Sequence, residues 1–148
     1  MIQRYRAFYE GKMYGVKAVI WTSRGLYVTL DEGNKAGRRV RGAVLMQSTG
    51  LFDVNGNAVF EGDVVRWGMH SPGGHELYHR YAKVQIHPDL QFKILFYVDS
   101  RNNERKKGDG HIFRYGSFAY RKTELYLEII GNVWEGGDLI DLSNPEAD

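Results

Sequence analysis

The sequence contains no cysteine, and this absence excludes several kinds of chemistry together. Disulfides, cysteine nucleophiles and Cys-ligated zinc or iron all need thiols, so only His and carboxylate side chains remain as metal ligands. Long apolar runs are missing too, because segments such as residues 18–21 and 94–98 are far shorter than the roughly 18 residues of a bilayer-spanning helix. We therefore predict a protein without a transmembrane helix and without a membrane partner.

Proline is scarce, with 3 residues in 148, while 43% of the chain is hydrophobic and 14% is aromatic. This composition is typical of a folded chain with a buried core and not of a disordered one. The length fits a single domain, which we predict to span residues 1–148. The first residues are charged and lack the apolar stretch of a secretory signal, which favours a cytoplasmic location.

Positive charge is missing from the last part of the chain. Residues 123–148 contain seven acidic side chains and no Lys or Arg, so all 20 basic residues precede them. Residues 1–122 consequently hold 20 basic against 11 acidic side chains, although the formal net charge of the chain is only +2. Such an excess can attract phosphate if the cations share a face. Alternatively, the acidic end folds against the basic body, or both are simply solvated.

Alternation of polar residues with Val, Ile, Tyr, Phe and Trp recurs along the chain, whereas helical periodicity is rare. The pattern predicts strands at residues 3–9, 16–21, 26–30, 40–47, 59–60, 64–67, 81–87, 92–98, 111–120 and 125–134. Loops are predicted at residues 33–39, 69–76 and 101–110. The expected fold is mainly β, with antiparallel strands forming a small, partly open, SH3-like or similar barrel. Irregular loops and at most one or two short helices complete this expectation.

The clearest local signal is the run LMQSTGLFDVNGNAVFEGDVVRW at residues 45–67. Asn55-Gly56 predicts a type I′ hairpin turn, which needs positive φ at both central residues. Glu61-Gly62-Asp63 predicts a second turn, in which Gly62 is free to adopt positive φ.

This run resembles the central signature of the YopX family of phage and prophage proteins. Residues 6–8 with 12–14 resemble the opening of the family, and residues 128–135 resemble its closing strand. The chain departs from the family pattern after Glu135, where Gly136-Gly137-Asp138-Leu139 replaces the usual Asn-Pro-Glu-Leu. The resemblance implies a small, mostly β protein of a host bacterium's phage or prophage, with no agreed activity, no catalytic residues and no cofactor. It also implies a structural role for the signature positions, namely Gly50, Asp53, Asn55, Gly56, Glu61, Gly62, Asp63 and Gly131.

His75-Glu76-Leu77-Tyr78-His79 matches the H-E-x-x-H pattern of zinc hydrolases. In those enzymes two His ligands lie one helical turn apart, and a third ligand comes from elsewhere. His70, His87 or His111 could supply it here. However, Pro72-Gly73-Gly74 precedes the motif and a strand-like pattern follows it, so we expect an exposed loop.

Two loops are basic, at residues 35–41 and 101–107, and a third segment at residues 114–122 interleaves cations with aromatic residues, as proteins that bind single-stranded nucleic acid do. They contain the candidate nucleic-acid-binding residues Arg38, Arg39, Arg41, Arg101, Arg105, Lys106, Lys107, Arg114, Tyr115 and Tyr120. The competing interpretation is that the cations protect strand edges and that the tyrosines are half-buried.

We therefore predict a non-enzymatic phage accessory protein that acts by binding a host or phage protein. The alternative is a small β-barrel that binds nucleic acid, and the second alternative is a zinc-dependent hydrolase that uses His75, Glu76 and His79. Whether the chain forms a homo-oligomer stays open.

Overall fold

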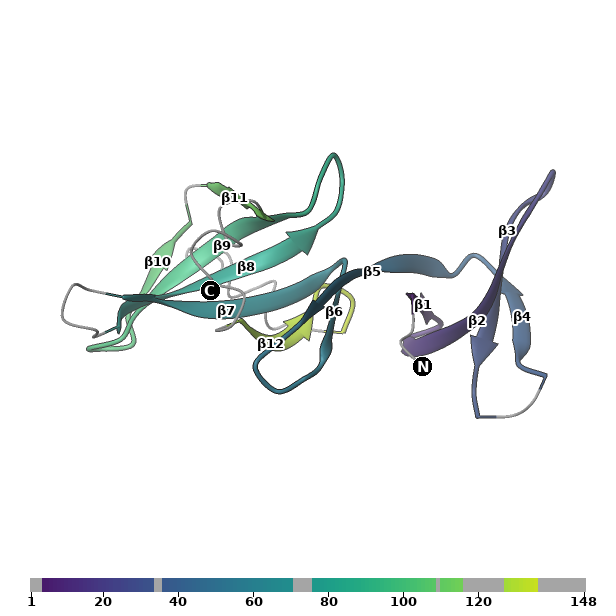
Figure 1. The fold of residues 1–148 in the computed structure, drawn as a ribbon, viewed down its shortest axis with the longest axis horizontal. Coiled ribbons are helices and arrows are strands. Elements are labelled where there is room, and N and C mark those ends of the chain that lie inside the picture. Colours follow the sequence, from purple (N-terminus) through teal and green to yellow (C-terminus); the bar gives the residue numbers. More distant parts are fainter. Residues whose placement is uncertain (1–3, 34–35, 71–75, 109, 116–126, 136–148) are drawn as a thin grey trace. The chain divides into compact units, whose positions relative to one another are not determined.

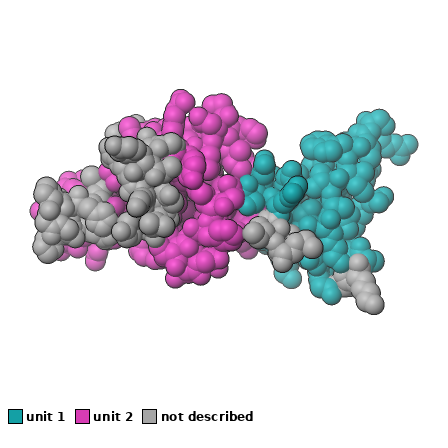
Figure 2. Space-filling view, viewed as in Figure 1, with its two compact units in different colours: residues 1–48 teal, residues 49–148 magenta. Residues whose placement is uncertain are grey.

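The structure is a computed structural model that describes residues 4–33, 36–70, 76–108, 110–115 and 127–135. The described chain consists of antiparallel strands with turns between them (Figure 1). It divides into two compact units, residues 1–48 and residues 49–148, which Figure 2 shows in different colours. We call these unit 1 and unit 2 and describe each by itself.

Unit 1 is an antiparallel sheet in which β1 to β4 pair in the order in which they follow one another in the sequence. Its strand order is β4-β3-β2-β1-β5, and β6, which lies in unit 2, pairs with β5 beyond it. The strands are β1 (Tyr5–Tyr9), β2 (Lys12–Thr22), β3 (Gly25–Asp31), β4 (Arg38–Arg41) and β5 (Val44–Phe52). Residues 49–52 of β5 belong to unit 2. Ala7, Val28, Leu30 and Val40 form its buried cluster, against which Tyr9 and Tyr14 pack.

Turns with left-handed backbone separate these strands. In the turn between β1 and β2, Glu10 and Gly11 have φ angles of 48° and 83°. The single strand predicted at residues 40–47 is wrong, because Gly42 has a φ of 86° and the chain breaks there into β4 and β5. An extended strand does not accommodate such a backbone angle.

Unit 2 contains the second sheet, with the strand order β10-β9-β8-β7-β12, and β11 pairs with β9. Its strands are β6 (Ala58–Phe60), β7 (Asp63–His70), β8 (Glu76–Gln85), β9 (Gln91–Asp99), β10 (Arg105–Lys107), β11 (Ile112–Arg114) and β12 (Glu128–Asn132). The core of unit 2 includes Val59 of β6, which is buried with residues of β7, β8 and β9. Trp67 lies at the centre, with its ring 6.1 Å from Phe92 and 5.8 Å from Phe113 in edge contacts.

The prediction of a mainly β, antiparallel fold is confirmed. The two sheets are not closed into a barrel, so the observed fold fits the partly open form of the expectation. β10 lies where a loop was predicted, because residues 105–107 are all cationic and show no alternation of apolar side chains. Pairing with β9 in register makes them a strand.

The predicted type I′ turn at Asn55-Gly56 is wrong, although a tight turn is present there. Gly56 has a φ of 81°, but Asn55 does not have a positive φ. The N–H of Gly56 donates to the carbonyl of Asp53 at 3.0 Å, and the N–H of Asp53 donates to the carbonyl of Asn57 at 2.8 Å. The turn therefore has ordinary right-handed central residues, with a left-handed glycine after them.

We predict that Gly56→Val lowers the free energy of unfolding by about 1 to 3 kcal/mol, because a β-branched residue is strained at positive φ. A Cβ at this position meets no atom within 4 Å, so the loss reports the backbone angle and not a clash. Chemical denaturation monitored by Trp fluorescence measures the change. Gly56→Asn is the control and should lose less, because Asn adopts this region more readily. Equal stabilities of Gly56→Val and the wild type would contradict the turn assignment.

Candidate nucleic-acid interface

The cations of β4 lie on two different faces of the unit 1 sheet. Successive side chains of a strand alternate in direction, and Val40 is buried, so Arg39 and Arg41 lie on the face opposite to Val40. Both arginines are exposed. In the antiparallel register Arg41 lies opposite Tyr27 of β3, and Arg39 lies opposite Thr29. We call Tyr27, Thr29, Arg39 and Arg41 the basic face.

Arg38 is on the other face and is held by its neighbours. Its guanidinium carbon lies 5.6 Å from the ring centre of Tyr9 and 5.8 Å from that of Tyr14. It also forms an ion pair with Glu32 at 2.6 Å. Desolvation lowers the pKa of Arg38, but Glu32 and Tyr14 outweigh it and the pKa is raised. The three arginines of β4 therefore do not form one surface, because the period of two separates Arg38 from the other two.

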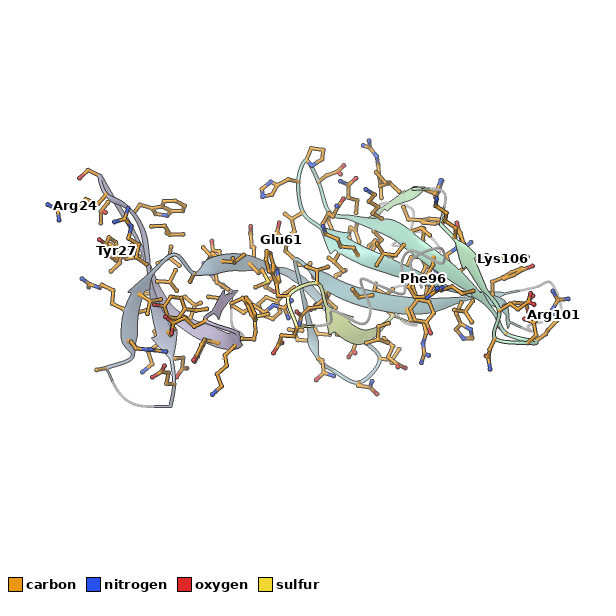
Figure 3. The ribbon with its side chains drawn as sticks, turned by 180° about the vertical axis from the view of Figure 1, so that it is seen from behind. Arg24, Tyr27, Glu61, Phe96, Arg101 and Lys106 are labelled. Atoms are coloured by element: carbon orange, nitrogen blue, oxygen red, sulfur yellow. The ribbon has the colours of Figure 1, made fainter. Side chains whose placement is uncertain are left out.

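The basic face continues to the turn that joins β2 and β3. Figure 3 labels Arg24 and Tyr27 near the end of this hairpin. The Nε atom of Arg41 lies 3.8 Å from the position that a Cβ on Gly25 would take, so the Arg41 guanidinium reaches the turn. Trp21, the last but one residue of β2, lies opposite Leu26 and therefore on the other face of the sheet, and it is 76% exposed. The alternation pattern of residues 16–21 predicts the strand but gives no sign that this indole is left in solvent.

The charge of the chain is divided in the same way as its compact units. Residues 1–48 contain nine Lys or Arg side chains against three Asp or Glu, whereas residues 49–148 contain 11 against 15. The sequence predicts an excess of cations before residue 123, and the structure concentrates this excess in unit 1. A nucleic acid approaching unit 1 would therefore meet a positive field.

The cations of β10 are also divided between two faces, because Arg105 and Lys107 alternate with Lys106. Arg105 lies 5.8 Å above the ring of Phe96, and the Lys106 ammonium is 3.4 Å from the Tyr78 hydroxyl. Phe96 and Lys106 are labelled in Figure 3. These cations pack on the aromatic side chains of the sheet, which gives them a structural role alongside any contact with phosphate.

Two further candidate cations of unit 2 are paired with acids. Arg101 binds the carboxylate of Asp99 through Nε at 3.0 Å and through Nη2 at 2.9 Å. Hydrogen bonds from Arg101 lower the pKa of Asp99 to about 2. Arg114 forms an ion pair with Asp89 at 3.3 Å. Each of these arginines therefore already has an anionic partner.

The candidate tyrosines divide between the core and the part that the structure does not describe. Tyr115 is half-buried and packs against the core of unit 2, which supports the interpretation as a core residue. Tyr120 lies outside the described residues.

The exposed loop expected at the H-E-x-x-H motif is wrong for its last four residues, which begin strand β8. In the zinc hydrolases the two His ligands lie one turn apart on a helix, whereas residues four apart on a strand are separated by about 13 Å. Because residues 76–79 form a strand, they do not have the backbone conformation of that motif. The ring of His79 instead contacts the Ser100 hydroxyl at 3.3 Å, and His75 lies outside the described residues. Among the described residues, no group of three or more His, Asp or Glu side chains is placed to hold a metal ion.

Asp53 is a buried carboxylate that connects the β5–β6 turn to β12. Its Oδ1 accepts the N–H groups of Asn55 at 3.0 Å and Asn57 at 2.9 Å, and its Oδ2 accepts the N–H of Ile129 at 3.0 Å. Burial raises the pKa of Asp53, but these hydrogen bonds outweigh it, with the Ile129 bond first, and the pKa is lowered. The carboxylate is thus ionised and has a structural role.

Other signature positions have comparable roles. Asp63 is 1% exposed, and its carboxylate accepts the N–H of Phe60 at 2.8 Å. This hydrogen bond closes the turn that contains Glu61, which is half-buried. Gly50 and Gly62 have φ angles of 82° and 88°, and the predicted positive φ of Gly62 is confirmed. Gly131 lies where the pairing of β12 with β7 shifts register.

These features define an antiparallel β protein with two compact units, whose signature residues organise the turns and the closing strand of the second. The chain matches the family model described as YopX protein over residues 4–141, and it belongs to this family. The match covers both units, while a single domain over residues 1–148 stays a prediction. Within the described residues, no helix has the length and apolar character needed to cross a membrane.

The chain also resembles the crystal structure of protein EF1440 from Enterococcus faecalis. The two are 20% identical, with a TM-score of 0.53, and the alignment covers 95% of this chain and 99% of the other. This similarity concerns the fold. No curated protein matches the chain.

We predict that Asp53→Asn lowers the free energy of unfolding at pH 7 by about 1 to 3 kcal/mol, because an amide cannot accept all three N–H groups. Since folding lowers the pKa of Asp53, its stabilisation is complete above about pH 4 and is lost as the pH falls through the folded-state pKa. The difference between the two proteins should therefore narrow on acidification, as urea denaturation at several pH values would measure. Asp31→Asn is the control with a smaller loss, because the Asp31 carboxylate accepts the N–H of Gly33 at 3.0 Å in an exposed turn. A constant difference would contradict the role of the charge.

We also predict that the purified protein holds no stoichiometric zinc, because Glu76–His79 adopt a strand and not a helix. Elemental analysis after dialysis measures this directly. One zinc per chain that disappears in His79→Ala would contradict the prediction and support the hydrolase.

Proposed function

We propose that this YopX-family protein, encoded by a phage or prophage, acts by binding and not by catalysis, and that the basic face of unit 1 binds nucleic acid. Arg39 and Arg41 would contact phosphates, while Tyr27 and Thr29 would contact sugars or bases. Contacts of this kind to the backbone depend little on base sequence.

The support for a non-catalytic role comes from the buried acidic residues of the described chain. Asp53 and Asp63 accept backbone N–H groups in turns, and Asp99 binds Arg101. The pKa values of Asp53 and Asp99 are lowered, whereas a general acid at neutral pH needs a raised pKa. These carboxylates serve the fold.

The observation that carries the nucleic-acid proposal is that Arg39 and Arg41 are exposed and form no ion pair among the described residues. Both lie on the basic face. Arg38, Arg101 and Arg114, by contrast, each pair with an acid. Cations without acidic partners release the counterions of a nucleic acid at no cost in broken ion pairs.

A host or phage protein is the second candidate partner, and one observation favours it. Phe52 and Val54, on either side of the buried Asp53, are 45% and 49% exposed. Two apolar side chains at a turn fixed by hydrogen bonds could enter a pocket of a partner protein. These two side chains belong to unit 2, whereas the residues of the basic face belong to unit 1.

We predict that the protein binds a fluorescein-labelled 20-nucleotide oligothymidylate with a Kd on the order of 10⁻⁴ to 10⁻⁶ M at physiological salt. The double variant Arg39→Gln/Arg41→Gln should weaken binding. It should also reduce the slope of log K against log salt by about 1.4, since each single-strand phosphate contact contributes about 0.7. Fluorescence anisotropy over a series of salt concentrations measures both quantities.

Arg38→Gln is the control, because it removes one positive charge from the same strand but on the opposite face. We expect it to leave the salt slope nearly unchanged and to reduce stability, as Glu32 loses its partner. A double variant with the wild-type slope, or a wild type that does not bind at low salt, would contradict the proposal. Retention of a host protein that is lost in Phe52→Asp would then favour the second candidate.

A further inference from the structure

Two lysines lie side by side on the face of the unit 2 sheet that is directed away from its core. Lys83 of β8 and Lys93 of β9 each lie between two residues of the buried core cluster. Successive side chains of a strand alternate in direction, so both lysines are directed away from this core. The β8–β9 register places Lys83 directly opposite Lys93, so that two cations are neighbours on one face.

A third lysine, Lys107 of β10, lies on the same face. It lies directly opposite Phe96 of β9, which in turn lies opposite Tyr81 of β8. The rings of Tyr81 and Phe96 stack with 4.5 Å between their centres, and Tyr81 is two residues from Lys83 on the same strand. The spacing of strands and residues in a sheet puts the backbones of Lys93 and Lys107 about 11 Å apart. We call Lys83, Lys93 and Lys107 the lysine face.

The lysine face is not neutralised by acids of the described chain. Lys93 and Lys107 are exposed, and none of the three lysines forms an ion pair with another described residue. Glu128, which the register places on this face opposite Arg66, binds that arginine at 2.9 Å. The three lysines are therefore available to an external anion, although residues 49–148 hold more acidic than basic side chains.

Protection of a sheet edge does not explain Lys83 and Lys93. Lysine on an edge strand deters the addition of another strand, but β8 and β9 are internal strands of the order β10-β9-β8-β7-β12 (Figure 1). Like charges directly opposite each other on neighbouring strands are destabilising. This pair therefore lowers the stability of the free protein, and a bound anion would remove the repulsion.

The aromatic rings of this face are already in contact with other groups. The Arg66 guanidinium lies 6.0 Å from the ring centre of Tyr81, and the Arg105 guanidinium lies 5.8 Å from that of Phe96. Phe96 is only 2% exposed, so its ring is not available to stack on a base. The face thus offers cations for phosphates and not rings for bases.

We infer that the lysine face is a second binding surface for the phosphate backbone of nucleic acid. Lys83 and Lys93 contact neighbouring phosphates, and Lys107 contacts the backbone further along. The chain then binds nucleic acid through both of its units, with little dependence on base sequence. This inference extends the proposed function to unit 2, but it uses none of the residues of the basic face.

The test measures binding of a fluorescein-labelled 20-base-pair duplex by fluorescence anisotropy over a series of salt concentrations. Lys83→Gln/Lys93→Gln should weaken binding and reduce the slope of log K against log salt by about 1.8, since each duplex phosphate contact contributes about 0.9. Lys107→Gln should reduce the slope by about 0.9. Lys106→Gln is the matched control, because it removes the same charge from the neighbouring position of β10 on the opposite face, and it should leave the slope nearly unchanged.

Thermal unfolding without nucleic acid gives an independent measurement. Lys93→Gln should raise the melting temperature by about 1 to 3 °C at low salt, because the repulsion from Lys83 is removed. The gain should shrink at about 1 M salt, where charges on the surface are screened. A lower melting temperature would show that Lys93 already binds an acid of the chain and would overturn the inference.

Unchanged affinity and salt slope in Lys83→Gln/Lys93→Gln would also overturn the inference. Equal losses in Lys107→Gln and Lys106→Gln would do the same, because they would report the net charge and not the face. If Arg39→Gln/Arg41→Gln weakens binding and the variants of the lysine face do not, the proposed function stands and the second surface does not. If only the variants of the lysine face weaken binding, the inference stands and the basic face of unit 1 does not. If no variant weakens binding, both fall.

Discussion

The carboxylate of Asp53 is the interaction on which the arrangement of unit 2 depends. It accepts N–H groups from its own turn and from Ile129, 76 residues further along the chain. A buried carboxylate without donors is costly, and so are buried N–H groups without an acceptor. One side chain satisfies both and thereby fixes the turn before β6 and the start of β12 together. Asn132 ends β12 in a similar way, because its Oδ1 accepts the N–H groups of Trp134 and Glu135 at 2.9 and 2.8 Å.

The strand period of two then decides what the cations can do. In β4 it separates Arg38 from Arg39 and Arg41, and in β10 it separates Lys106 from Arg105 and Lys107. In unit 2, cations pack on aromatic rings. The Arg66 guanidinium lies 6.0 Å from the ring centre of Tyr81, and the Tyr81 ring stacks on Phe96 with 4.5 Å between ring centres. A run of basic residues in the sequence is therefore not a basic surface, because half of its members are directed to the opposite side of the sheet.

Much of the fold could be predicted from the sequence, because apolar alternation and glycine turns are local properties. The turn at Gly62 and most strands of both units follow from them. The predictions failed where pairing with a neighbour overrides local preference, as in β10 and the first residues of β8. The type I′ assignment failed for another reason. Asn-Gly favours that turn in isolation, but the Asp53 carboxylate binds the N–H groups of Asn55 and Asn57 and stabilises a different one.

The candidate site was less predictable than the fold, because its properties depend on pairs that are distant in the sequence. Arg38 and Arg39 are adjacent and chemically identical, yet only Arg38 forms an ion pair among the described residues, with Glu32. Trp21 lies opposite Leu26, on the face that carries the buried residues of its sheet, and yet it is 76% exposed, which the alternating pattern does not reveal. The signature that defines the family lies instead in the turns and closing strand of unit 2. This signature gives no information about Arg39 and Arg41, the cations of unit 1 on which the proposed binding rests.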